Sequence, residues 1–262
     1  MERRIFMKPK YVFDKPLIEG IIVDHPNRFL MHVKVNGKVY LAHSPTTGKI
    51  GLVKVDGCPA LLSKALDPNR RTKFTVEAIS YDKPSVENKE WIGINQGASN
   101  RYIGYFIASG AMEEMVHRPE NLHPESTYAK SRFDFLSDNI YIEVKTPIRI
   151  IEKHLPTHLE KLPAGSGFGG DRLVKHMTEL AEMVEVTGNR AIILTCFQYR
   201  REPDCGYHYD NDAKRMVNYV DAPKIVEAFE HAKSAGVENW TVELSISPTG
   251  VTLERYYREK DD

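Results

Sequence analysis

Apolar and polar residues alternate over short stretches in the first part of the chain. Residues 31–42 alternate on both sides of Asn36-Gly37, which is typical of a two-residue β-hairpin turn. A further strand is predicted for residues 74–81. Because no long amphipathic helix precedes residue 100, we predict that residues 1–95 form a small β-barrel or sandwich.

After residue 96 the spacing of apolar positions changes. Helical spacing predicts helices at about 100–115, 171–186 and 223–235, and the apolar run 191–197 predicts a buried strand. Residues 96–262 are therefore predicted to form a second domain of mixed α/β class.

A second hairpin is predicted within this α/β part. Apolar residues alternate with polar ones on both sides of Asp138-Asn139, and a two-residue turn there places Asp134 directly opposite Glu143. Their Cβ atoms are then expected to lie about 5 Å apart. Lys145, two residues after Glu143, is expected on the same sheet face.

Two carboxylates that face each other repel unless a cation lies between them. Oxygen ligands with room for water suit Mg²⁺ or Mn²⁺, and a neighbouring ammonium group can orient water or stabilise charge on phosphoryl oxygens. Asp134 and Glu143 are thus predicted metal ligands, with Lys145 as a catalytic partner in phosphodiester hydrolysis. Ordinary cross-strand ion pairs on an exposed hairpin explain the same spacing without any function.

Charge limits where an anionic partner can bind. The 262 residues include 36 basic and 36 acidic side chains, so a phosphate-binding surface must come from local clusters. Arg70, Arg71 and Lys73 form the densest basic cluster, and Arg172 and Lys175 begin a predicted helix, where basic groups favour an anionic partner. Solvated surface turns and helix faces remain the alternative explanation.

Cysteine use and hydropathy favour a cytoplasmic protein. Three widely spaced cysteines disfavour a disulfide scaffold and a zinc knuckle, and no stretch is long and apolar enough to span a membrane.

Two other patterns carry less. The run Gly165–Gly170 matches a phosphate-binding glycine pattern and leaves a nucleotide binder as a rival function, but no strand leads into it, so a flexible loop is favoured. His154 and His158 have metal-like spacing, yet Pro156 between them prevents a regular helix.

The order of several segments resembles the sugar fermentation stimulation protein (SfsA) family. The segments are Arg28–Leu30, His43–Gly48, Leu62–Lys64, Asp67–Arg71, Ile94-Asn95 with Asn100, Ser131–Phe135, Glu143–Lys145, and Arg172 with Lys175-His176.

This resemblance implies an N-terminal OB-like nucleic-acid-binding barrel followed by a restriction-endonuclease-like PD-(D/E)XK domain. Asp134, Glu143 and Lys145 match that nuclease motif, and the resemblance makes Glu125 a further catalytic residue and Gln198 a weaker candidate. Arg132, in the matching Ser131–Phe135 segment, joins the basic residues expected to contact nucleic acid.

The sequence therefore predicts a Mg²⁺-dependent nuclease, with Mn²⁺ as a possible substitute, and favours DNA over RNA as its nucleic-acid partner. The alternative is a DNA-binding regulator that keeps the nuclease scaffold without cleaving. The chain departs from the family pattern between Thr146 and Asp171, where it is longer.

Overall fold

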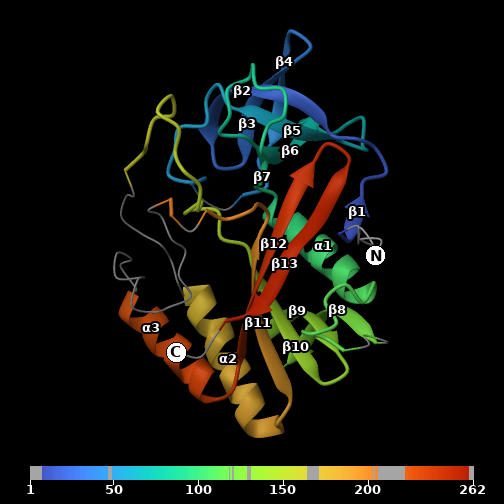
Figure 1. Ribbon diagram of the computed structural model, residues 1–262, viewed down its shortest axis with the longest axis vertical. Coiled ribbons are helices and arrows are strands. Elements are labelled where there is room, and N and C mark those ends of the chain that lie inside the picture. Colours follow the sequence, from blue (N-terminus) through green and yellow to red (C-terminus); the bar gives the residue numbers. More distant parts are fainter. Residues whose placement is uncertain are drawn as a thin grey trace, which may run out of the picture.

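A barrel and a larger sheet with helices on both faces make up the protein (Figure 1). The computed structural model describes residues 8–46, 49–117, 119, 121–128, 131–163, 171–202, 204–205 and 222–259. The predicted glycine loop at 165–170 lies outside the described residues.

The N-terminal part is a closed OB-like barrel. Its sheet has the order β4-β3-β2-β5-β6-β7, and parallel pairing of Ala42 with Phe74 and of His43 with Thr75 joins β4 to β6 and closes it. The strands are β2 (Ile18–Asn27), β3 (Leu30–Val35), β4 (Lys38–His43), β5 (Pro59–Lys64), β6 (Phe74–Ile79) and β7 (Ile92–Gly93).

The second part is a seven-stranded mixed sheet in the order β1-β13-β12-β11-β10-β9-β8. Its strands are β1 (Lys10–Val12), β8 (Leu122–Tyr128), β9 (Ser131–Ser137), β10 (Ile140–Lys145), β11 (Arg190–Phe197), β12 (Glu238–Ser247) and β13 (Gly250–Arg258). β10, β11 and β12 run parallel, and every other neighbouring pair is antiparallel. The predicted fold class, an OB-like barrel followed by an α/β domain, is confirmed.

In the described part of the chain, helices α1, α2 and α3 cover the two faces of this sheet (Figure 1). α1 (Gln96–Ala108) packs against one face through its buried side chains Tyr102 and Phe106. The crossover helices α2 (Asp171–Thr187) and α3 (Ala222–Ser234) pack together against the other face. The residues between these layers form two separate apolar cores, and the barrel holds a third.

Local sequence explains where several elements begin and end. Asn36 and Gly37 both adopt positive φ (48° and 80°), as the predicted hairpin turn requires. The helix predicted at 100–115 instead spans 96–108, because the Asn95 side chain caps it by accepting a hydrogen bond from the Ala98 N–H (3.1 Å).

The two parts share a core. Ile148 and Ile151, which follow β10, pack inside the barrel together with Phe197 and Tyr199 at the end of β11. The olive segment in Figure 1 follows the barrel for this reason, and Val53 forms a β-bridge with Lys161 there. The first residues of the 146–171 region, where the chain departs from the family pattern, therefore connect the sheet to the barrel.

The first described strand belongs to the second sheet. β1 pairs antiparallel with β13, whereas the sequence predicts residues 1–95 together in the barrel. From β1 at the edge of the large sheet, the described chain builds the barrel and then returns to the sheet. Among the described residues, no helix is long and apolar enough to cross a membrane.

Candidate functional site

The β9–β10 hairpin has the predicted register. Asp138 adopts a positive φ of 50°, Ser137 pairs with Ile140, and Phe135 pairs with Ile142. Beyond that pair the Val144 N–H donates to the Asp134 Oδ2 atom at 2.7 Å. The side chain of Asp134 thus takes a hydrogen bond from β10 where the described backbone pairs between the two strands end.

Asp134 is held from two sides. Its Oδ2 accepts from Val144, and its Oδ1 accepts from the Asn100 amide of α1 at 2.6 Å. Burial, and then the nearby Glu143 charge, raise the pKa of Asp134 despite these hydrogen bonds. The site therefore resists a full negative charge on Asp134 when only protein groups surround it.

Glu143 is buried, with 4% of its surface exposed. Its Oε1 lies 2.5 Å from the Lys145 Nζ and 2.5 Å from the His176 Nδ1 of α2. Burial acts to raise the pKa of Glu143, but the hydrogen bonds from His176 and Lys145 outweigh it and the pKa is lowered. Its second oxygen, Oε2, is buried and has no hydrogen-bond partner among the described residues.

This donor set fits a small hard cation. An ionised carboxylate oxygen that is buried without a partner is costly, and a cation between Asp134 and Glu143 removes both that cost and their mutual repulsion. Within the described ranges, no three His, Cys, Asp or Glu side chains are grouped to hold a metal. Mg²⁺ is commonly held by only one or two carboxylates, with water and phosphate as the remaining ligands, so two carboxylates suffice.

Glu125 does not join this group. β8 places it opposite Asp134, between the pairs Pro124–Phe135 and Ser126–Phe133, but it adopts a positive φ of 56°. Its exposed carboxylate lies 3.5 Å from the Arg132 guanidinium. Among the described residues, Glu125 forms no ion pair or hydrogen bond with Asp134 or Glu143, so no contact supports its predicted catalytic role.

Gln198 follows β11 at the junction with the barrel. Its amide nitrogen donates to the Asn95 carbonyl (2.8 Å), and its Oε1 is buried without a hydrogen-bond partner in the described part of the chain. It thus contacts the residue that caps α1.

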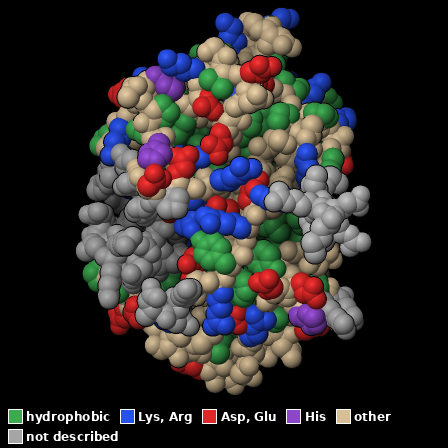
Figure 2. All heavy atoms as spheres, in the orientation of Figure 1, with side chains coloured by type: hydrophobic (Ala, Val, Ile, Leu, Met, Phe, Trp, Pro, Cys, Tyr) green, Lys and Arg blue, Asp and Glu red, His purple; other side chains and the backbone are tan. Residues whose placement is uncertain are grey.

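The predicted basic residues lie in two separate places. Arg70, Arg71 and Lys73 are in the β5–β6 connection of the barrel, where Lys73 donates to the Pro68 carbonyl (2.7 Å). Arg172 and Lys175 are exposed in the first turns of α2, and Arg172 is one turn before His176 on the same helix face. Figure 2 shows basic and acidic side chains interspersed over the described part of one face, in keeping with the neutral net charge.

Two residues that contact the carboxylates were not predicted to do so. In the sequence, both His176 and Asn100 stand out only as parts of the family pattern, whereas the structure places them on Glu143 and Asp134. Both belong to segments that carry the family resemblance, which was the available signal. Their contacts depend on how α1 and α2 pack on the sheet, which spacing along the chain does not reveal.

An OB-like barrel joined to an α/β domain, with a buried Glu143 beside a half-buried Asp134, defines a two-part architecture. The chain matches the SfsA N-terminal OB domain over residues 23–94 and the sugar fermentation stimulation protein RE domain over residues 97–250. It therefore belongs to the sugar fermentation stimulation protein family, as the sequence resemblance predicted.

Individual relatives agree along nearly the whole chain. Sugar fermentation stimulation protein homologs from Pseudoalteromonas atlantica and Marinomonas sp. are 31% and 32% identical, covering 93% and 95% of this chain and 97% and 90% of their own. The structure of Pyrococcus furiosus SfsA in complex with Ca²⁺ superposes with a TM-score of 0.67 at 17% identity, covering 95% of this chain and 97% of that one. An OB domain is a common nucleic-acid-binding fold, so the family assignment indicates nucleic-acid binding.

Proposed function

We propose that this protein is a metal-dependent nuclease that hydrolyses phosphodiester bonds, with Mg²⁺ as its cofactor and Mn²⁺ as a possible substitute. The observation that carries the proposal is the buried Glu143 Oε2, which lacks a partner in the described chain. Burial and the nearby Glu143 charge also raise the pKa of Asp134. Such a carboxylate pair is stabilised by a cation.

Each residue has a distinct part in this proposal. Asp134 and Glu143 would hold the metal, which would supply Lewis-acid activation of the phosphodiester and of the attacking water. Lys145, whose ammonium group already lies 2.5 Å from Glu143, orients the attacking water or stabilises negative charge on the phosphoryl oxygens. Asn100 and His176 fix the two carboxylates in place.

A related fold supports the choice of a hard divalent ion. The Pyrococcus furiosus SfsA structure was determined in complex with Ca²⁺, which binds oxygen ligands as Mg²⁺ does. Ca²⁺ commonly takes more ligands at longer distances than Mg²⁺. We therefore expect Ca²⁺ to bind this site without replacing Mg²⁺ in cleavage.

The proposed substrate is nucleic acid, with DNA favoured over RNA. The barrel contributes Arg70, Arg71 and Lys73 as phosphate contacts, and α2 contributes Arg172 and Lys175 close to His176. Arg132 is a further phosphate contact once its exposed ion pair with Glu125 opens.

Cleavage assays test the proposal. Labelled single- and double-stranded DNA and RNA are incubated with Mg²⁺, Mn²⁺, Ca²⁺ or EDTA, with the wild type and Asp134→Asn purified in parallel. We expect cleavage with Mg²⁺ or Mn²⁺ that is abolished by EDTA and by the substitution. Asp138→Asn, the same change at the exposed turn of the same hairpin, is the matched control and should cleave like the wild type.

The outcomes separate two functions. Cleavage retained by Asp134→Asn would overturn the metal assignment. DNA binding without cleavage under any of these conditions would instead favour a regulator built on a nuclease scaffold.

A further inference from the structure

A hollow on the barrel lies outside the carboxylate site. Its volume is about 300 Å³, and it is lined by His25, Asn27, Arg28, Lys49, Ile50, Val53, Val55 and Leu162. This volume is at the lower end of the range of small-molecule sites. It suits one small ligand.

The lining has an apolar floor and a basic rim. Ile50, Val53 and Val55 are buried with 3 to 5% of their surfaces exposed, whereas Arg28 and Lys49 are exposed at the edge. An apolar floor beside two cations, of which Lys49 also donates to the Pro163 carbonyl (3.0 Å), matches a group that carries a hydrophobic ring face and a phosphate.

His25 adds an unmet hydrogen-bonding group. Its ring lines the hollow, and its Nε2 is buried without a partner among the described residues. Burial lowers the pKa of His25 although the charges of Asp56 and Asp24 act to raise it. The lowered pKa favours the neutral imidazole. A neutral ring nitrogen can hydrogen-bond to the edge of a base, and it does not contribute a charge that attracts any anion.

Hydrogen bonds fix the turn that carries Arg28 at the rim. Arg28 and Phe29 form the turn between β2 and β3, the Phe29 carbonyl accepts from the Ser44 N–H (2.8 Å), and Asn27 accepts from the Phe29 N–H (3.0 Å). The Arg28 guanidinium lies 4.5 Å from the centre of the half-exposed Phe29 ring. A stacked planar cation and an exposed ring provide a surface on which bases can stack.

We propose that this hollow binds a single unstacked nucleotide of a nucleic-acid strand. The base lies over Ile50, Val53 and Val55 with its edge toward His25, while Arg28 and Lys49 contact the adjacent phosphate. The inference rests on the nucleic-acid binding in the proposed function and not on cleavage. It gives the barrel a preference for single-stranded or unpaired nucleotides over a continuous duplex, because a paired base is not free to enter.

The test measures binding in EDTA, so that cleavage plays no part. Fluorescence anisotropy gives the dissociation constants of a labelled single-stranded DNA, the same sequence as a duplex, and a strand with abasic sites. Free nucleoside monophosphate serves as a competitor, to separate a free-nucleotide site from a strand site. The full chain is used throughout.

We expect Arg28→Ala combined with Lys49→Ala to weaken single-strand binding by about tenfold or more. The matched control, Lys34→Ala with Lys38→Ala, removes two exposed barrel cations on and next to β3, toward the opposite end from the Arg28–Phe29 turn, and should change binding by less than about threefold. His25→Leu should reduce the preference for a normal over an abasic strand without lowering thermal stability, since it removes a nitrogen that has no partner in the described structure.

Equal losses in the hollow pair and the control pair, or full affinity for the abasic strand, would overturn the nucleotide site while leaving general nucleic-acid binding intact. A second pair of results would overturn it in favour of a free-nucleotide site: free nucleotide competes at low concentration, and the variants of the hollow bind the strands with unchanged affinity. Absence of any binding by the wild type would overturn both this inference and the binding part of the proposed function. Failure of the cleavage assay alone leaves the hollow untouched.

Discussion

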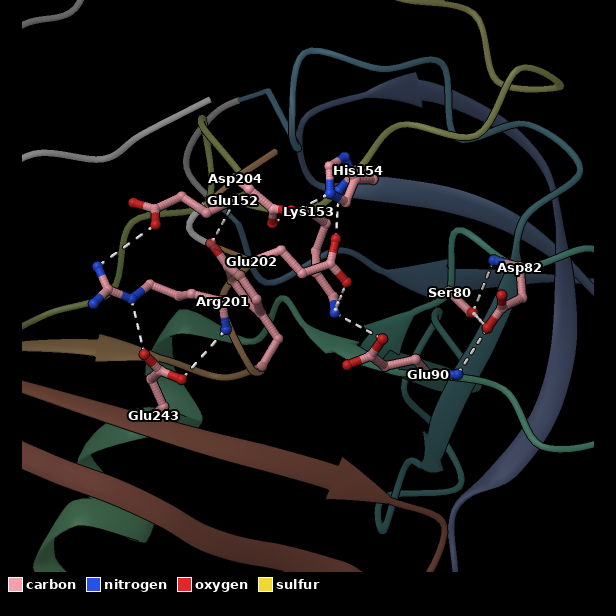
Figure 3. Close-up of polar contacts among 11 residues, drawn as sticks. Ser80, Asp82, Glu90, Glu152, Lys153, His154, Arg201, Glu202, Asp204 and Glu243 are labelled. Atoms are coloured by element: carbon pink, nitrogen blue, oxygen red, sulfur yellow. Dashed lines mark hydrogen bonds and ion pairs between the residues drawn. The ribbon is translucent and has the colours of Figure 1, made fainter. Parts of the chain in front are cut away.

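Glu143 and Glu243 are both buried glutamates in the same sheet, but their surroundings differ. Glu243 on β12 is 2% exposed; its Oε1 accepts from Arg201 (2.9 Å) and Arg255 (2.6 Å), and its Oε2 accepts from the Arg201 N–H (3.3 Å). Figure 3 shows Arg201 between Glu243 and Glu152. Glu143 on β10 has one satisfied oxygen, one oxygen without a partner in the described chain, and a second carboxylate nearby.

This difference separates a structural ion pair from a candidate reaction centre. The charge of Glu243 is compensated within the protein, where it ties the end of β11 to β12 and β13. At the Asp134 and Glu143 pair, the Glu143 Oε2 has no partner in the described chain, and burial together with the Glu143 charge raises the pKa of Asp134. A buried carboxylate is therefore informative about function when the protein groups around it do not satisfy all of its hydrogen bonds or balance its charge.

The largest expected effect is on stability and concerns Glu243. Glu243→Gln should lower the free energy of unfolding by about 3 kcal/mol, because it removes the carboxylate shared by Arg201 and Arg255 and leaves the largely buried Arg201 with the longer ion pair to Glu152 (3.5 Å). In EDTA, Asp134→Asn should lower it far less or raise it, because it removes one of two like charges. Urea unfolding followed by circular dichroism measures both.

Glu227→Gln on the exposed side of α3 controls for the loss of a glutamate charge and should have almost no effect. A loss in Asp134→Asn as large as in Glu243→Gln would remove the distinction drawn between the two sites.

The next effect sharpens the role of His176. The His176 side chain orients the Glu143 carboxylate by a hydrogen bond and is not itself a proposed metal ligand. His176→Ala should therefore reduce cleavage by about tenfold to a hundredfold and raise the Mg²⁺ concentration needed for half-maximal activity. Metal titrations of the cleavage rate measure both quantities.

His176→Asn, which retains a short side-chain donor, should restore part of the metal affinity. His231→Ala removes a half-exposed histidine from α3 and should leave the titration unchanged. If His176→Ala altered only thermal stability, the residue would be structural.

The smallest effect is a pH dependence of stability in the absence of metal. Burial and the Glu143 charge raise the pKa of Asp134, so the folded state binds this proton more tightly than the unfolded state. The contribution of Asp134 to stability is then present below its ordinary pKa and is lost as pH rises through the raised value. Asp134→Asn cannot titrate, and should gain stability relative to the wild type over that window.

Urea unfolding in EDTA from about pH 4 to about pH 7 measures this difference. Glu143 works in the opposite direction, since its lowered pKa gives stability that is lost as pH falls, but it is present in both proteins. A difference that stays constant with pH would contradict the environment assigned to Asp134.

The sequence was sufficient for much of the fold because the relevant signals are local. The Asn36-Gly37 and Asp138-Asn139 turns and the apolar run at 191–197 each define an element within a few residues. The hairpin register follows from the turn, so the proximity of Asp134 and Glu143 followed as well.

Long-range packing was not accessible in the same way. His176 contacts Glu143 across 33 positions, and Asn100 contacts Asp134 across 34. The isolation of Glu125 depends on one residue with positive φ inside a strand, which residue type alone did not reveal. Roles of this kind require the tertiary arrangement of the helices.

The pairing of β1 with β13 makes the large sheet depend on the two ends of the described chain. During synthesis, Lys10–Val12 emerges early but finds its partner only when residues 250–252 have been made. A fragment beginning at α1 would leave the β13 edge open to pairing with other chains. The barrel and the sheet thus follow one another in sequence, yet the sheet is the last to be completed and is not separable by a single cut.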